Sequence, residues 1–124
     1  MARAAKVDPR PTAVKVRLRI ACGDDDAFGP GKAQLLESLL ATGSLNQTAG
    51  ALKMSYVKAL ALVRAMNAHF RQPLVELSRG GAQGGGARIT DLGQRVLEEY
   101  HAMREASEAA ARPGWRRLRS LLKG

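Results

Sequence analysis

Five glycines lie between two arginines in residues 79–88, and this stretch has the composition of a loop that could hold phosphate. Glycine-rich loops bind the phosphates of nucleotides when the last glycine is followed by Lys and then by Ser or Thr. Here Gly86 is followed by Ala87 and Arg88, so the spacing excludes a P-loop. We therefore expect the glycines to form a long hairpin loop that becomes ordered on a partner.

The other residues that could do chemistry are too scattered to form a catalytic or metal site. His69 and His101 are far apart in the sequence and lack carboxylate or thiol partners at ligand spacing. The aspartates at 24–26 have no glutamate at calcium-loop spacing, which favours a solvated turn. The single cysteine, Cys22, follows an apolar alternation and is expected to be a small buried hydrophobe. We predict no metal, no cofactor and no enzymatic activity.

The charge of the chain points to a polyanionic partner, either nucleic acid or an anionic membrane surface. The net charge is +9 and the sequence pI is about 10.6. Residues 1–22 carry six Lys or Arg residues and one acidic residue. Residues 112–124 carry five Lys or Arg residues and no acidic residue, whereas residues 23–111 are nearly neutral. One cysteine excludes an internal disulfide, and no signal-peptide or transmembrane run is visible, so we expect a cytoplasmic protein with no membrane partner.

Hydrophobic periodicity predicts a strand followed by three helices. Residues 1–12 have no periodicity and are expected to be a disordered basic arm. Apolar and basic residues alternate over 14–20, as in a half-buried strand. Helices are predicted from Pro30 or Lys32 to Ala41, over 44–52 and over 55–70, where the last two begin at a serine that can cap the helix.

A hairpin and a long helix follow. The predicted strands cover residues 74–77 and 87–89, on either side of the glycines. Thr90 can cap a helix from Asp91 to about Ala111. A basic amphipathic tail, 112–124, would come after it. We predict a mainly α protein with a small β-wing, a winged helix-turn-helix domain over residues 13–111 that ends in a long dimerisation helix.

A helix-turn-helix binds DNA by placing the N-terminal part of its second helix in the major groove while the first helix braces on the backbone. The second and third predicted helices would form this pair, and the arginines beside the glycine loop would contact phosphate or the minor groove. The predicted DNA-binding residues are Ser44, Gln47, Thr48, Ser55, Tyr56, Lys58, Arg79 and Arg88.

Each of these assignments has a structural alternative. Ser55 can be a helix cap, a DNA contact or both. Tyr56 can instead pack against the base of the wing as a half-buried spacer. Lys58, Arg79 and Arg88 can be solvated surface cations without a partner.

One apolar stripe on the long helix predicts self-association. Four of its residues recur at helical spacing, and a helix with one exposed apolar seam is stabilised by pairing with a copy of itself. These predicted dimerisation residues are Leu92, Val96, Tyr100 and Met103.

Residues 44–67 and 73–97 resemble the N-terminal DNA-binding domain of ModE-type molybdate-responsive regulators and, more distantly, helix-turn-helix domains of the LysR type. The resemblance covers roughly residues 14–103. It implies a winged-helix homodimer, held partly by the long helix and the first-strand region, that binds a palindromic operator and regulates transcription. Its most specific parts are Ser55-Tyr56, Met66-Asn67, the glycine-rich wing, and Thr90 with Gly93-Gln94.

The resemblance also implies strand-rich molybdate-binding domains after the long helix. No counterpart follows Ala111, so we do not expect molybdate as a ligand of this chain. Two alternatives stay open. The basic tail could bind a membrane surface or another protein, which would make the chain an adaptor, or a dimer interface could hold molybdate weakly near its arginines.

Overall fold

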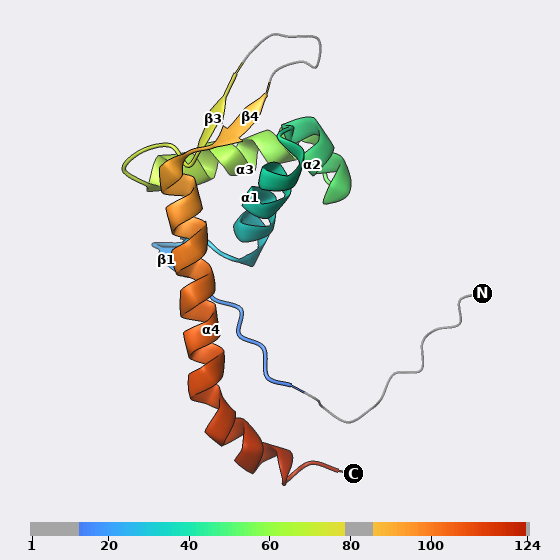
Figure 1. The fold of residues 1–124 in the computed structure, drawn as a ribbon, viewed down its shortest axis with the longest axis vertical. Coiled ribbons are helices and arrows are strands. Elements are labelled where there is room, and N and C mark those ends of the chain that lie inside the picture. The colour runs from blue at the N-terminus through green and yellow to red at the C-terminus, as the bar shows by residue number, and fades with distance from the viewer. Residues whose placement is uncertain (1–12, 79–85, 124) are drawn as a thin grey trace, which may run out of the picture.

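The computed structural model describes residues 13–78 and 86–123, which form a small helical body with one long projecting helix (Figure 1). A β-hairpin lies at one end of the molecule, and the long helix extends toward the other end. The elements are β1 (Ile20–Cys22), β2 (Asp25–Phe28), α1 (Pro30–Thr42), α2 (Leu45–Ala51), α3 (Tyr56–His69), β3 (Val75–Leu77), β4 (Ala87–Ile89) and α4 (Asp91–Arg119).

The starts of three helices were predicted from serine and threonine caps, and the structure confirms them. The Oγ of Ser44 accepts a hydrogen bond from the backbone N–H of Gln47 at 3.1 Å. Ser55 caps α3 in the same way through the N–H of Lys58, at 3.0 Å. Thr90 caps α4, with its Oγ1 accepting from Gly93 at 3.0 Å. Each cap satisfies one of the donors that the first turn of a helix leaves unpaired.

The core lies where α1, α3 and the two hairpins meet. Its largest fully buried side chains include Phe28, Leu35, Leu36 and Met66. Tyr100 of α4 joins them, because its ring packs edge to face on Phe28 with centroids 5.1 Å apart. One contiguous apolar cluster therefore connects the helix-turn-helix to the beginning of α4.

The second hairpin is the predicted wing. β3 and β4 pair antiparallel, with Val75 opposite Ile89 and Leu77 opposite Ala87. Ser78 and Gly86 exchange backbone hydrogen bonds of 2.9 and 3.1 Å where the described parts of the two strands end. The helix-turn-helix, the wing and the long C-terminal helix confirm the predicted fold class.

The strand predicted over residues 14–20 is wrong. β1 begins only at Ile20 and pairs with β2 across a turn at Gly23, where φ is +62°. Residues 13–19 are extended and lie beside α4, where Tyr100 Oη donates to the carbonyl of Leu18 at 2.9 Å. Alternate side chains of residues 13–19 are partly buried because this segment packs on a helix, since no strand in the described residues pairs with it.

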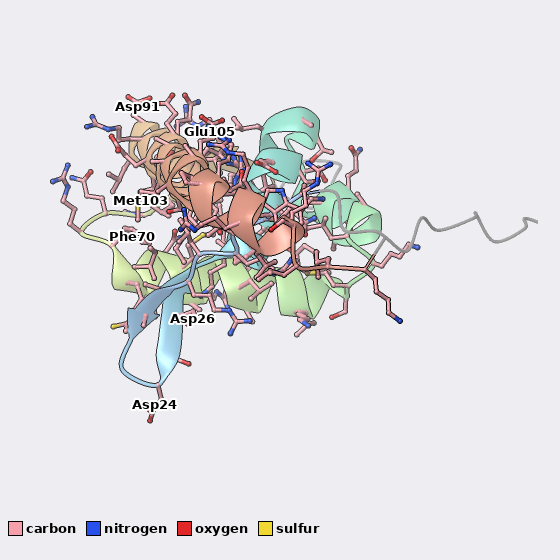
Figure 2. The ribbon with its side chains drawn as sticks, turned by 90° about the horizontal axis from the view of Figure 1, so that it is seen from below. Asp24, Asp26, Phe70, Asp91, Met103 and Glu105 are labelled. Atoms are coloured by element: carbon pink, nitrogen blue, oxygen red, sulfur yellow. The ribbon has the colours of Figure 1, made fainter. Side chains whose placement is uncertain are left out.

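The β1–β2 hairpin projects from the body, with Asp24 at its turn (Figure 2). Cys22 lies in this hairpin and is exposed, so the prediction of a buried cysteine is also wrong. The hydrophobic alternation continues up to Cys22, but the hairpin carries that residue away from the core. Local pattern alone could not show where the projecting hairpin begins.

The predicted end of the long helix at Ala111 is wrong too. α4 continues through Pro113 to Arg119 and is 29 residues long. A helix of this length spans about 44 Å at a rise of about 1.5 Å per residue. The basic residues expected in a separate tail therefore lie mostly on the last turns of α4. No helix in the described part of the chain is long and apolar enough to cross a membrane.

Candidate nucleic-acid interface

The helix-turn-helix consists of α2, α3 and the turn between them. α2 contacts both α1 and α3. The turn is closed by a 3.0 Å hydrogen bond from the N–H of Met54 to the carbonyl of Ala49. Lys53 has a φ of +59° there, the left-handed conformation that ends a helix sharply. This turn places the N-terminal end of α3 at the surface.

Three of the predicted DNA-binding residues lie together at that end. Ser55, Tyr56 and Lys58 are all exposed, and Tyr56 exposes 44% of its surface. Because Ser55 Oγ already accepts the N–H of Lys58, its cap role is real, and the hydroxyl retains its own proton for donation.

The bracing residues on α2 divide into accessible and buried ones. Gln47 is exposed, and Ser44 is half-buried as the cap of the helix. Thr48 is fully buried, and its Oγ1 lies 3.1 Å from the hydroxyl oxygen of Thr42. The prediction that Thr48 contacts DNA is therefore wrong. It is a structural residue whose hydroxyl ties α1 to α2.

The wing presents one predicted cation in the described residues. Arg88 forms an ion pair with Glu76 across the two strands at 2.5 Å, and both side chains are largely exposed. Exposed pairs contribute little stability, about 0–1 kcal/mol, so a phosphate could replace the carboxylate. Arg79, the other predicted wing cation, lies outside the described residues.

Sequence reasoning missed the outward face of α3. The core face consists of Ala59, Val63 and Met66, all fully buried. On the opposite side of the helix, a set of exposed residues recurs at spacings of three and four. We call this set the outer α3 face, and it consists of Val57, Ala61, Arg64, Ala65 and Ala68. The same 3.6-residue period that identified the core face could have identified it.

The electrostatics around this face favour an anionic partner. The chain has no Asp or Glu from Ser38 to Val75, a stretch that includes all of α2 and α3. Its four cations are Lys53, Lys58, Arg64 and Arg71, and none of them forms an ion pair with another described residue. The positive charge is therefore not neutralised within the described structure.

Asn67 holds the wing against α3. Its Oδ1 accepts the backbone N–H groups of Leu74 and Val75 at 2.8 and 3.2 Å, and its Nδ2 donates to the Val75 carbonyl at 3.0 Å. Leu74 and Val75 are buried, so these bonds satisfy backbone groups that water does not reach. Asn67 therefore contributes three of the hydrogen bonds that fix the wing next to α3.

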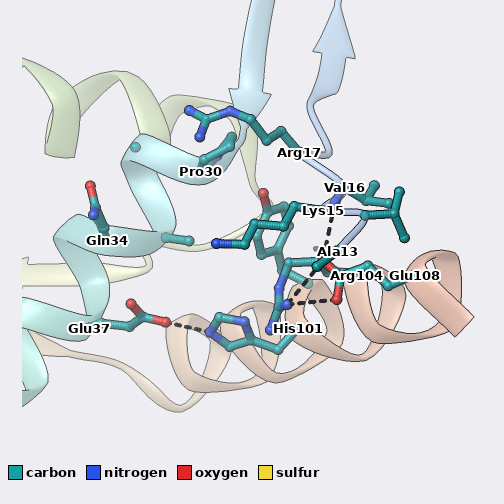
Figure 3. Close-up of a pocket in the computed structure, with 14 residues that line it drawn as sticks. Ala13, Lys15, Val16, Arg17, Pro30, Gln34, Glu37, His101, Arg104 and Glu108 are labelled. Atoms are coloured by element: carbon teal, nitrogen blue, oxygen red, sulfur yellow. Dashed lines mark hydrogen bonds and ion pairs between the residues drawn. The ribbon is translucent and has the colours of Figure 1, made fainter. Parts of the chain in front are cut away.

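A separate cavity of about 750 Å³ lies between residues 13–17, the start of α1 and α4 (Figure 3). Among the residues that line it, His101 Nε2 lies 2.5 Å from Glu37 Oε2, and this contact connects α4 to α1. Glu108 accepts the N–H of Val16 at 3.1 Å and pairs with Arg104 at 3.3 Å. Both carboxylates are thus paired with groups of the chain itself.

The four predicted dimerisation residues differ in accessibility. Met103 exposes 45% of its surface (labelled in Figure 2), whereas Leu92 and Val96 are half-buried against the core cluster. Tyr100 is only 4% exposed because it belongs to the core of its own chain. Within this stripe of α4, the apolar surface available to another molecule therefore comes from Leu92, Val96 and Met103.

Comparison with curated proteins finds relatives with consistent names. The chain is 34% identical over 94 residues to the molybdenum transport protein ModE of Azotobacter vinelandii, which is 74% of this chain and 35% of that protein. It is 36% identical over 81 residues to the transcriptional regulator ModE of Haemophilus influenzae, 65% of this chain and 32% of that protein. The DNA-binding transcriptional dual regulator ModE of Escherichia coli is 33% identical over 81 residues, 65% of this chain and 31% of that protein.

These matches cover only part of each relative. The chain spans about one third of the length of the curated relatives it matches. No protein-family model matches it. Over the aligned residues, the chain with its helix-turn-helix, wing and long helix is therefore similar to about one third of regulators named ModE.

Proposed function

We propose that this protein is a DNA-binding transcriptional regulator that places α3 in the major groove and the β3–β4 wing on the adjacent backbone. The single observation that carries the proposal is the exposed, acid-free surface of α2 and α3 beside a wing. An α-helix with side chains is about 10–12 Å wide and the major groove is about 12 Å wide, so α3 fits it. The names of the relatives support the same role.

Within this scheme the predicted residues have different roles. Tyr56 and Lys58 are at the N-terminal end of α3, from which recognition helices reach base edges. Gln47 is exposed on α2, where the bracing helix meets a phosphate. Arg88 exchanges its exposed partner Glu76 for the DNA backbone.

We further propose that the protein acts as a homodimer on a palindromic site. The apolar residues Leu92, Val96 and Met103 lie along one side of α4, and a two-fold symmetric pair would cover them in both copies. The two α3 helices would then read half-sites about one turn of DNA apart, roughly 34 Å.

The test is selection of bound fragments from random and genomic duplex DNA, followed by binding measurements on the enriched sequence. We expect enrichment of a sequence with two inverted half-sites. We also expect Tyr56→Ala and Lys58→Ala to weaken binding to it. A matched control is Lys123→Ala, an exposed cation beyond the last turn of α4. Failure to enrich any sequence would contradict the proposed function.

A second candidate function is supported by the basic end of α4. Arg116, Arg117 and Arg119 lie on its last turns with the exposed Leu118 between them, near the end of the helix away from the wing. An adaptor would use this end to bind an anionic membrane surface or another protein. If the chain is an adaptor, replacing the three arginines by Ser should abolish its binding to anionic vesicles. If it is a DNA-binding regulator, the same variant should bind the selected DNA as the wild type does.

A further inference from the structure

The outer α3 face has an unusual composition for an exposed helix surface. Four of its five members are apolar, and the fifth, Arg64, is the only charged residue. Solvated helix faces ordinarily carry mixed charges and long polar side chains. We propose that this face reads a thymine methyl group through Val57 and a guanine through Arg64. This proposal rests on the proposed function and names the bases that the same surface recognises.

Val57 is the clearest sign of a partner. It exposes 74% of its surface, more than any other described large hydrophobic residue except Leu121. A β-branched residue has lower helix propensity than alanine, so its presence near the start of α3 does not stabilise the helix. In the major groove, the one apolar group that a base edge presents is the 5-methyl group of thymine.

The alanines of the face allow α3 to approach the bases closely. Ala61, Ala65 and Ala68 are exposed and follow Val57 along the same side of the helix. A side chain of a single methyl group leaves the helix backbone free to approach its partner, as small residues do where two helices pack. Lys58 and Tyr56 are exposed beside this face and remain available for their own contacts with the duplex.

Arg64 is the only long side chain of the face. It is exposed and forms no ion pair with another described residue. An arginine that points into the major groove binds the O6 and N7 atoms of guanine with two hydrogen bonds. Arg64 comes seven positions after Val57, a rise of about 10.5 Å along the helix axis. At about 3.4 Å per base pair, the thymine and the guanine would be about three base pairs apart.

The experiment uses the duplex that the full chain selects. Each thymine of a half-site is replaced in turn by deoxyuridine, which removes only the 5-methyl group. We expect one replacement to weaken binding of the wild-type protein about fourfold, which corresponds to about 0.8 kcal/mol for one buried carbon. The Val57→Ala variant should bind more weakly and should not respond to that replacement. In a second series, each guanine is replaced by 7-deazaguanine, which lacks the N7 acceptor. We expect one of these replacements to lower the affinity of the wild type at least fivefold and to leave the affinity of Arg64→Ala unchanged.

The control variant is Leu118→Ala, which truncates an exposed hydrophobic residue near the C-terminal end of α4. It should keep the wild-type response to both base changes. Both Val57 and Arg64 are exposed, so these variants are expected to fold. If every thymine-to-deoxyuridine change affects wild type and Val57→Ala equally, the thymine assignment is wrong. If every 7-deazaguanine change affects the affinity of wild type and Arg64→Ala equally, the guanine assignment is wrong. Failure of the proposed function is distinguishable, because the wild type would then select no duplex.

Discussion

Gly93 shows how one residue decides whether α4 can pack against the wing. A Cβ at this position would collide with the carbonyl oxygen of Leu74 and would lie 2.8 Å from Cγ2 of Ile89. Both neighbours belong to the base of the wing, and the backbone atom cannot move aside cheaply. The absence of a side chain at Gly93 is therefore a condition for the close approach of α4 to the wing.

Replacing Gly93 by Ala is expected to lower the free energy of unfolding by about 1–3 kcal/mol, the usual range for overpacking. Urea denaturation followed by circular dichroism measures the change. The control is Gly50→Ala on α2, where a Cβ meets nothing within 4 Å and should stabilise the helix by about 0.8–1 kcal/mol. Equal effects of the two substitutions would contradict the close packing at Gly93.

Asn67 is the second residue on which the site depends. Replacing it by Ala removes three hydrogen bonds to the buried Leu74 and Val75 backbone. We expect a loss of at least about 3 kcal/mol, because three backbone groups lose their partner and each unsatisfied buried group costs about 1–3 kcal/mol. Asn46→Ala, on the exposed side of α2, should change stability by less than about 0.5 kcal/mol. Both variants are measured by the same denaturation experiment, and an equally small effect at Asn67 would show that the wing is held by other contacts.

At the scale of the element, α4 crosses a proline that ordinarily ends a helix. Pro113 has no backbone N–H and its ring crowds the preceding turn, so the helix interior there lacks one hydrogen bond. A proline followed by a glycine is typical of a helix end, and the predicted end at Ala111 lies just before Pro113-Gly114. The helix nevertheless resumes, because good helix formers flank the pair over residues 109–112 and 115–119.

We expect Pro113→Ala to slow amide hydrogen exchange over residues 114–119, because it restores the missing hydrogen bond. The free energy of global unfolding should change by less than about 0.5 kcal/mol, since these last turns are mostly exposed. Arg112→Ala changes the same turn without restoring a backbone donor and is the matched control. Unchanged exchange in Pro113→Ala would mean that the proline does not weaken this part of α4.

The elements themselves were largely predictable. The caps at Ser44, Ser55 and Thr90, and the apolar period of α3, depend on residues within about one turn of one another, so the sequence displays them directly. The alternation over 14–20 misled because a strand also needs a partner. In the structure this segment packs on α4 instead, and the carbonyl of Leu18 accepts a hydrogen bond from Tyr100, which is 82 residues away in the sequence.

At the scale of the whole molecule, the apolar side of α4 predicts a dimer. Met103 is exposed on that side, so Met103→Glu should leave the fold intact and shift the protein toward the monomer. Ala109 is exposed about 120° around the helix from Met103, and Ala109→Glu is the matched control. Size-exclusion chromatography with light scattering measures the mass of each. A monomeric wild type at micromolar concentration would contradict the homodimer.

The two ends of the molecule are expected to contribute differently to DNA affinity. Neutralising Arg88 should reduce the slope of log affinity against log salt by about 0.9, the value for one phosphate contact on duplex DNA. Neutralising Arg116, Arg117 and Arg119 together should leave the slope unchanged, because about 44 Å of helix runs from the wing to the end of α4. Fluorescence anisotropy between 50 and 200 mM salt distinguishes the two variants. An equal reduction by both would show that the far end of α4 also contacts the duplex.

The sequence by itself determined where the helices begin, their caps, the hairpin on either side of the glycines and the basic character of the chain, because these depend on neighbouring residues or on composition. Only the tertiary structure decided which side chains are available. It buried Thr48 and Tyr100, exposed Cys22, and turned Val57 and Arg64 outward. The physical reason is that exposure depends on contacts between segments far apart in the chain, and a local pattern does not contain those contacts.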